Sequence, residues 1–400
     1  MKNFANKEGI EKRVYIYLCL FAFSNVFSVA VSNVFLVLSI AGTLHRLVRY
    51  RDDVKKIFFR QKSFFCVVLV LWGAIVLSIP NSLDPVQGIK EFFNYYVYRM
   101  MALPVVLLCI HEKKQVLNIA LCMVAAMLIN NVYSIVQGIN AYPNPGRYTG
   151  FMNVMPHASF LAVFIPASLV VWGKVKESKL RWGCMLFCLI SCFAFIFNGT
   201  RGAWLATLVS VLFLMLLQMK NKRNFLALTL AAGFIFGGLY QTMPSFQQRV
   251  QSIANPQEQS NIERRLLWHS AWNMFIEHPI TGVGMANFKQ NYQEHYILPA
   301  AKEPHLGHAH NNFMHVLAEA GLLGLGALIA FWGYLFIYGV KGWCKHRKPV
   351  FLLILAVLLG VVLHGLTEYT WGTALTVKLF WLSIALCFKW IALDKSVTEC

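Results

Sequence analysis

Arg201 is the first residue of this sequence whose type and setting could do chemistry. It lies in the short glycine-containing turn 198–202, which separates two apolar runs. A planar guanidinium with several N–H donors suits phosphate oxygens, and the flanking glycines let the backbone turn sharply. The turn therefore indicates an anion site. The alternative is an interfacial arginine that reaches toward lipid headgroups.

Arg265 belongs to a second polar segment, which predicts an amphipathic helix. Ser260 and Glu263 have the spacing of a capping box, and His278-Pro279 would end the helix. The alternative is a helix that lies on the membrane with its arginines at lipid headgroups. We assign that alternative to Arg264, and we expect Arg265, which points in a different direction, to bind an anion.

Arg147 is the third candidate anion ligand. It lies in the turn-rich loop 143–151, just before an apolar run. By itself this position says little, and its interest comes from the other two arginines.

Histidines are concentrated in one stretch, because seven of the twelve fall between positions 269 and 315. His308 and His310 could share a zinc ion if the segment were extended, but no cysteine is near and the i, i+4 metalloprotease pattern is absent. We therefore expect no metal, and one histidine of this stretch as a general base. Glu319 is nine residues beyond His310, off its helical face, and is expected to orient a neighbour or cap the loop.

The composition predicts that membrane helices position these residues. Of the 400 residues, 58% are hydrophobic and 13% are charged, whereas soluble proteins carry about 25% charged residues. This excludes a disordered chain and argues against a soluble domain. Twelve apolar runs lie near 14–31, 33–45, 63–80, 95–110, 116–137, 157–173, 182–198, 203–219, 224–240, 316–340, 349–366 and 377–393.

Basic residues predict the sidedness of these spans. With both termini cytoplasmic, the short inner segments, together with Lys389 at the inner end of the last run, hold 26 of the 36 Lys and Arg residues. The net charge of +19 therefore does not require nucleic acid. The expected fold is an all-α polytopic membrane protein of about 12 transmembrane helices. Residues 1–240 would hold spans one to nine, 241–315 a large helical periplasmic loop, and 316–400 the last three spans.

Outer arginines and a histidine cluster on a membrane-embedded body indicate a lipid-linked phosphate or diphosphate as substrate. The arginines would neutralise a leaving diphosphate, and a histidine would activate an acceptor hydroxyl. The sequence has no phosphate-loop motif and no dinucleotide-binding motif, so we expect no nucleotide and no cofactor.

At these residues the sequence resembles the O-antigen ligase / O-antigen polymerase superfamily of bacterial cell envelopes. Four patches carry the resemblance: Arg147-x-x-Gly150-x-x-Asn153; Thr200-Arg201-Gly202-Ala203-Trp204-Leu205-Ala206; Arg265-x-x-Trp268 followed by Pro279-x-x-Gly282-x-Gly284; and His310-Asn311 followed by Leu317-Ala318-Glu319-x-Gly321-x-x-Gly324. Each patch is short, but the four occur in order and all lie on the predicted outer face.

The resemblance implies a glycosyltransferase type C-like fold and a metal-independent, inverting glycosyltransferase of the bacterial inner membrane. Its donor would be undecaprenyl diphosphate-linked glycan. Arg201, Arg265 and Arg147 would bind the diphosphate, and His310 would serve the acceptor, with His308 and His315 close enough to compete. The supporting residues would be Glu319, Trp268, Gly282 and Gly284.

Several functions remain open at this point. A ligase would transfer the glycan to lipid A–core in lipopolysaccharide biosynthesis, and we favour it over a polymerase that uses the same donor. A transporter or flippase should place ionisable residues at mid-membrane and often shows repeated halves, and a purely structural subunit would not explain the arginines. His364 and Glu368, near the outer end of the eleventh run, would line the substrate cavity or reach the interface.

Overall fold

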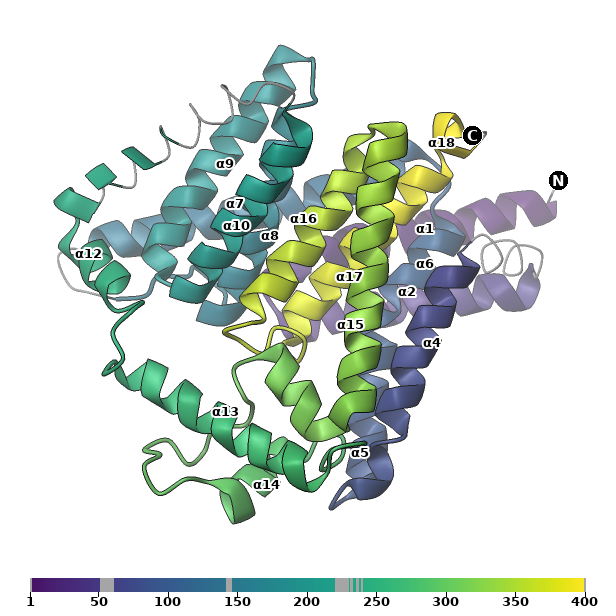
Figure 1. Ribbon diagram of the computed structural model, residues 1–400. Helices are drawn as coiled ribbons and strands as arrows, with labels where there is room; N and C mark the ends of the chain where they lie inside the picture. Colours follow the sequence, from purple (N-terminus) through teal and green to yellow (C-terminus); the bar gives the residue numbers. More distant parts are fainter. Residues whose placement is uncertain are drawn as a thin grey trace.

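The computed structural model describes residues 2–50, 61–141, 146–219, 230, 233–234, 237–238 and 240–398, and these residues form helices and connections without any strand (Figure 1). The helices are α1 (Lys2–Ser24), α2 (Val29–Arg49), α4 (Lys62–Val76), α5 (Pro85–Phe92), α6 (Ala102–Cys109), α7 (Lys113–Asn140), α8 (Val154–Trp172), α9 (Ser178–Asn198), α10 (Arg201–Gln218), α12 (Pro244–Gln251), α13 (Gln259–Glu277), α14 (Phe288–Asn291), α15 (Asn312–His346), α16 (Pro349–His364), α17 (Ala374–Ala392) and α18 (Lys395–Thr398).

The predicted all-α membrane fold is confirmed. Within the described residues, nine helical segments are long and apolar enough to cross a membrane, and α16 is a shorter apolar helix. Helices cover eleven of the twelve predicted runs, while most of the ninth run, 224–240, lies outside the described residues. The chain is therefore a polytopic helical membrane protein.

Two boundaries differ from those expected. The first turn lies at residues 25–28, so α2 is longer than the short second run suggested. The fourth span begins at Pro85, because α5, a π-helical turn at Phe93–Val97, a 3₁₀ turn at Tyr98–Met100 and α6 follow one another without a loop. Hydropathy alone places such ends poorly, since polar residues in a terminal turn lower the local average.

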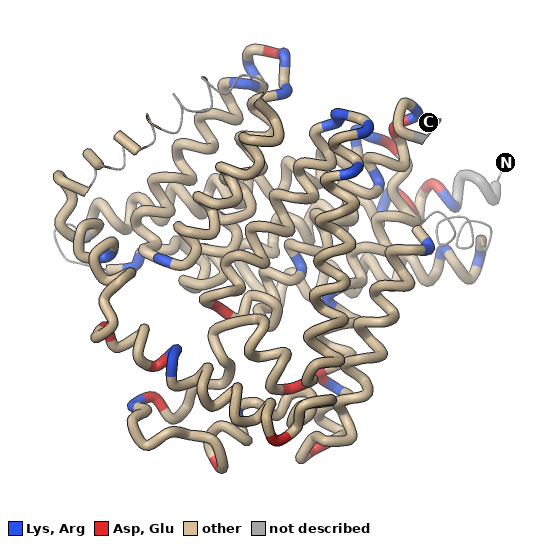
Figure 2. The backbone as a smooth tube through the Cα atoms, in the orientation of Figure 1, with Lys and Arg blue, Asp and Glu red and all other residues tan. Residues whose placement is uncertain are grey.

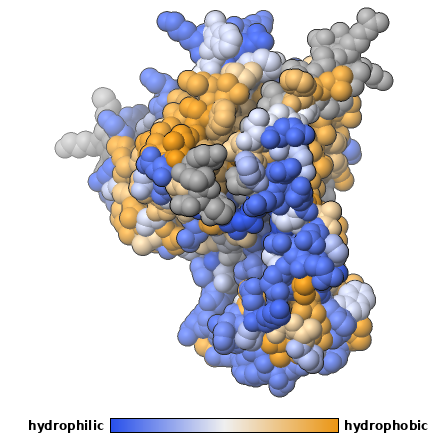
Figure 3. Space-filling model, turned by 90° about the vertical axis from the view of Figure 1, so that its left-hand side faces the viewer, coloured by the Kyte–Doolittle hydropathy of each residue, from blue (hydrophilic) through white to orange (hydrophobic). Residues whose placement is uncertain are grey.

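The centre of the bundle is formed by α8, α16 and α17, whose side chains are buried around most of each helix. A helix that is apolar on all sides is stable only where other apolar groups surround it. The peripheral helices α2, α9 and α10 bury one face and expose the other. In Figure 3 hydrophobic residues cover much of the upper body, while hydrophilic residues cover most of the lower part.

The lower part is formed by residues 252–311, in which α13 lies across the ends of the bundle helices (Figure 1). A second small core forms between α13 and the following loop, with Leu267, Ala271, Met274, Phe288 and Tyr292 fully buried. This core holds the polar segment as a folded unit and fixes α13 against α15.

A bend at Gly321 in α15 joins the lower part to the bundle. Gly321 has φ 59° and ψ −157°, which breaks the helical hydrogen-bond ladder. The amides of Leu322 and Leu323 donate instead to the carbonyls of Pro279 (2.9 Å) and Ile280 (3.2 Å). The lower segment therefore replaces the hydrogen bonds that the bend removes from α15.

The carbonyl groups that this bend leaves without helical partners are also satisfied by the same segment. Ala318 and Glu319 accept hydrogen bonds from the amides of Val283 (2.9 Å) and Gly284 (3.0 Å). A Cβ at Gly282 would lie 2.4 Å from the carbonyl carbon of Glu319, so only glycine allows this approach. The sequence patch that contains Gly282 and Gly284 is thus hydrogen-bonded through its backbone to the patch that contains Glu319 and Gly321.

Candidate functional site

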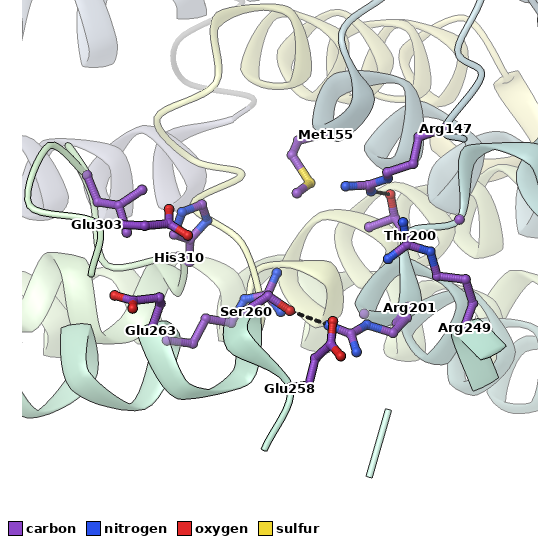
Figure 4. Close-up of a pocket in the computed structure, with 14 residues that line it drawn as sticks. Arg147, Met155, Thr200, Arg201, Arg249, Glu258, Ser260, Glu263, Glu303 and His310 are labelled. Carbon is purple, nitrogen blue, oxygen red and sulfur yellow. Dashed lines mark hydrogen bonds between the residues drawn. The ribbon is translucent and has the colours of Figure 1, made fainter. Parts of the chain in front are cut away.

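A cavity of about 280 Å³ lies between the bundle and α13, and it holds many of the residues that the sequence analysis selected. Figure 4 shows Arg147, Arg201 and Arg249 on one side of the cavity, and Glu263, Glu303 and His310 on the other. The cavity is thus basic on one wall, whereas carboxylates and a histidine form the opposite wall. Its other lining residues are Met155, Gly199, Thr200, Gly202, Glu258, Ser260, Arg264 and Leu306.

Arg201 occupies the first position of α10, directly after the turn that ends α9. Gly199 makes that turn with φ 67°, a conformation that favours glycine. The Arg201 guanidinium donates to the backbone carbonyl of Ser252 and to Ser260 Oγ at 2.6 Å (Figure 4). Its charge therefore lies at the cavity wall and also ties the lower segment to the bundle.

Arg147 is held against the same turn. Its Nε donates to the Asn198 carbonyl at 3.1 Å, and its Nη2 donates to Thr200 Oγ1 at 2.5 Å. No side chain caps the amino terminus of α10, so the first amide groups of this helix remain donors for an anion. The Arg147 guanidinium and the amino terminus of α10 therefore both contribute positive electrostatic potential to this wall of the cavity.

Positive charge is concentrated enough on this wall to change the acid–base behaviour of its members. Burial, together with the charges of Arg249, Arg264 and Arg201, lowers the pKa of Arg147 to about 10. Burial also lowers the pKa of Arg264. Arg147 stays charged at neutral pH, and a bound anion would relieve the repulsion between these groups.

Arg264, and not Arg265, contributes α13's charge to the cavity. Arg264 lines the cavity and forms no hydrogen bond within the part of the chain that the structure describes. Arg265 is exposed and donates to the carbonyl of Pro256 at 2.8 Å. The cavity wall therefore contains Arg264 and not Arg265, the reverse of the placement that the sequence analysis expected.

The phase of α13 explains this reversal. Its buried stripe contains Glu263, Leu267, Ala271 and Met274, so position 264 borders the buried face and position 265 lies opposite to it. The expected capping box is also absent. The helix begins at Gln259 after Glu258, while Ser260 accepts a hydrogen bond from Arg201.

His310 faces the arginines across the cavity and is held from behind by Glu368. The Nδ1 atom of His310 lies 3.0 Å from Oε2 and 3.1 Å from Oε1 of the Glu368 carboxylate. His310 has φ 47°, a strained value for a residue other than glycine and one that is found more often at functional sites.

The ionisation of Glu368 determines which nitrogen of His310 carries the proton. Burial by itself would raise the pKa of Glu368, but the hydrogen bond from His310 and the nearby His308 lower this pKa to about 2. The carboxylate is therefore ionised at neutral pH and can only accept. The proton of a neutral His310 then lies on Nδ1, which leaves Nε2 with a lone pair for a substrate.

His308 packs beside His310 and completes a cluster of three polar groups. Its Nδ1 accepts from the His310 amide at 3.3 Å and lies 3.8 Å from Glu368. Burial and the neighbouring His310 lower the pKa of His308 to about 4, so it is neutral at physiological pH. Contrary to the expectation from sequence, these three residues offer a possible metal site, with ligand atoms within 4.8 Å of one another.

His315 and Glu319 are buried behind this cluster and do not line the cavity. His315 Nε2 lies 3.4 Å from the Glu319 carboxylate, whose other oxygen accepts from the Phe288 amide at 3.0 Å. Trp268 donates from Nε1 to the Ala309 carbonyl at 2.9 Å, between the two cluster histidines. These residues, with Gly282 and Gly284, pack behind the loop that carries His308 and His310 and hold it in place.

Arg249 and Arg264 were not assigned to this site from sequence, and Glu368 was left open between the substrate cavity and the interface. Arg249 belongs to the short helix α12, which has no sequence feature of its own. Glu368 lies 58 positions beyond His310 and meets it only through the packing of α15 against α16. Its position near the outer end of an apolar run was the one available signal.

Comparison with known proteins gives two matches. A family model described as O-antigen ligase matches residues 184–329, which include Arg201, Arg264 and His310 but not Arg147 or Glu368. An O-antigen ligase from Salmonella typhimurium is 25% identical over 315 residues, which cover 75% of this chain and 76% of the relative. Both matches are to O-antigen ligases, and with the helical membrane fold they support the resemblance of this chain to the O-antigen ligase / O-antigen polymerase superfamily.

Proposed function

We propose that this protein is an O-antigen ligase-like, inverting glycosyltransferase that moves a glycan from undecaprenyl diphosphate to lipid A–core on the periplasmic face. The observation that carries the proposal is the cavity in which His310, held by Glu368, faces Arg147, Arg201 and Arg264. A base and an anion site on opposite walls suit a transfer in which a hydroxyl displaces a diphosphate.

The arginine wall would bind the donor diphosphate. Arg147 and Arg201 are fixed by neutral oxygens, so their positive charge is not cancelled by a carboxylate within hydrogen-bonding distance. Arg264 would complete the contact with the departing group. Charge that develops on the leaving diphosphate is stabilised where donors are already oriented, and this is commonly the largest contribution to such catalysis.

His310 would act as the general base. Its Nε2 would take the proton from an acceptor hydroxyl while that oxygen forms a bond to the anomeric carbon of the donor sugar. The bond from this carbon to the diphosphate oxygen breaks at the same time, and undecaprenyl diphosphate leaves with the electron pair. Attack opposite to the leaving group inverts the anomeric configuration, and Glu368 stabilises the resulting imidazolium.

The periplasmic assignment is supported by the distribution of basic residues. Figure 2 shows Lys and Arg gathered around the α15–α16 connection, at the end of α15 opposite to the cavity. The positive-inside rule assigns that end to the cytoplasm, and with it both termini. We therefore place the protein in the inner membrane, with its cavity open to the outer leaflet.

A reconstituted transfer reaction tests this function. Purified protein would receive undecaprenyl diphosphate-linked glycan and either lipid A–core or a second donor molecule, with chelator and without nucleotide. Glycan on lipid A–core is the expected product. Longer chains on the second donor alone would instead establish a polymerase, and no product with either acceptor would overturn the transferase proposal in favour of a transporter.

A further inference from the structure

A second large cavity lies at the other end of α15, far from Arg201 and His310. We call it the lysine groove, and its volume is about 870 Å³. Lysines form its mouth and aromatic and aliphatic side chains form its walls: Lys62, Lys341, Lys345, Tyr334, Ile337 and Tyr338. Nothing in the proposed transfer reaction uses these residues, so the groove needs an explanation of its own.

One face of α15 forms most of this groove. Tyr334, Ile337, Tyr338, Lys341 and Lys345 recur at helical spacing and therefore lie on one side of the helix. Ile337 is 52% exposed. The apolar part of this face precedes its charged part along the helix axis, so the groove changes from hydrophobic to basic toward the end of α15.

The opposite wall comes from other helices. Tyr338 packs against Phe351 of α16 with ring centroids 5.8 Å apart, and Tyr334 packs against Phe64 of α4 at 6.1 Å. Lys62 begins α4 and brings a third ammonium group to the mouth of the groove. Three helices thus hold the groove open, so it is not a depression made by one flexible side chain.

The charged side chains that the described residues contribute to the groove are basic. Lys62, Lys341 and Lys345 are exposed, and none of the described residues that line the groove is Asp or Glu. Figure 2 shows basic residues gathered around the neighbouring α15–α16 connection. The mouth therefore suits an anionic group, while the tyrosine and isoleucine walls suit a hydrocarbon chain.

The position of the groove identifies the leaflet that it faces. Between Gly321 and Lys341, α15 rises about 30 Å, at about 1.5 Å per residue. That rise equals the hydrocarbon thickness of a bilayer, roughly 30 Å. The groove therefore lies in the leaflet opposite to the cavity, and its occupant is a different molecule from the substrate of the cavity.

We propose that the lysine groove binds one anionic glycerophospholipid of that leaflet, with its phosphate at the three lysines and an acyl chain along Tyr334, Ile337 and Tyr338. Basic pockets between membrane helices bind anionic headgroups in this way. The proposal does not depend on the transferase activity, because it uses other residues, another leaflet and a binding measurement.

Native mass spectrometry of the full-length protein tests the proposal. The protein in detergent would be given equal amounts of phosphatidylglycerol and phosphatidylcholine, and the lipid that stays bound would be counted. We expect one phosphatidylglycerol to be retained in preference to phosphatidylcholine. Each lysine near an anionic headgroup contributes about fivefold to retention, so Lys62→Gln, Lys341→Gln and Lys345→Gln combined should weaken it about 100-fold.

Two further variants make the result specific to this groove. Lys114→Gln, Lys176→Gln and Lys179→Gln remove three exposed lysines elsewhere and should leave retention unchanged. Ile337→Trp fills the wall and should reduce retention without changing charge. Equal retention of both lipids, equal loss in the control triple variant, or displacement by millimolar inorganic phosphate would each overturn the proposal.

Discussion

The two walls of the cavity differ in the partners that hold their charged groups. Arg147 and Arg201 are bonded to carbonyl and hydroxyl oxygens, which fix the guanidinium groups without a carboxylate as a hydrogen-bond partner. His310 is bonded to a buried carboxylate, which fixes its tautomer and orientation. The arginine wall thus keeps positive charge available to a ligand, and the histidine wall is prepared to accept a proton.

A second contrast lies within the arginines themselves. Arg201 has three hydrogen-bond acceptors on the lower segment, whereas Arg264 has none among the described residues. Loss of Arg201 would therefore disturb both anion binding and the docking of the lower segment. Arg264 is the better residue for isolating the electrostatic contribution, because its replacement removes no hydrogen bond between the residues that the structure describes.

The largest effect is expected at His310. His310→Ala should lower transfer about 1,000-fold, because a positioned general base contributes roughly 10²–10⁴-fold. Binding of the lipid-linked donor should change little, since the arginine wall is intact. Transfer rates and donor affinity measured on the same preparation check this, and near-normal transfer would remove His310 from the proposed mechanism.

Arg264 and Arg265 form a matched pair for the anion site. Arg264→Ala should lower transfer about 100-fold, because it removes a donor from the leaving diphosphate. Arg265→Ala should stay close to the parent protein, since that side chain is exposed and bonded to the Pro256 carbonyl. Steady-state kinetics of both variants show which arginine binds the diphosphate. A larger loss in Arg265→Ala than in Arg264→Ala would support the sequence-based expectation that Arg265 binds the anion.

Glu368 should have a smaller effect than the residue that it positions. Glu368→Gln keeps the shape but removes the charge that fixes the His310 tautomer, so we expect a 10- to 100-fold loss. The loss should fall on the rate constant and not on donor affinity, and Glu368→Asp should recover part of the rate. An equal loss of donor binding would indicate a purely structural role.

His308 should contribute little to the dependence of transfer on pH. Its pKa of about 4 means that it becomes charged only below pH 4 and stays neutral over roughly pH 5–8. His308→Gln should therefore keep the shape of the pH–rate profile in that range. A changed acidic limb in this variant would mean that His308 titrates during the reaction and shares the role of base.

Chelation should produce the smallest effect. We expect EDTA to leave transfer unchanged, because hydrogen-bond donors and a base account for each proposed step. The contrary result is well defined, since His308, His310 and Glu368 are placed to hold a metal ion. Loss of transfer with EDTA, with recovery on addition of Zn²⁺, would show that these three residues bind a catalytic metal ion and that His310 is not a general base.

The sequence by itself determined the features that depend on local composition. Hydropathy located the described membrane helices, and the polar stretch between the ninth and tenth runs located the lower segment. Arg147, Arg201 and His310 could be selected because each lies in a distinctive turn or cluster beside an apolar run, and these three do line one cavity.

Only the tertiary structure decided which neighbours complete the cavity. Arg264 replaced Arg265 because the face that α13 buries depends on its packing against α15, and its largest aromatic side chains do not mark that face. Glu368 joined His310 because two loops at the ends of α15 and α16 meet in space. Helix phase and contacts between distant segments are properties of packing, and local sequence patterns do not encode them directly.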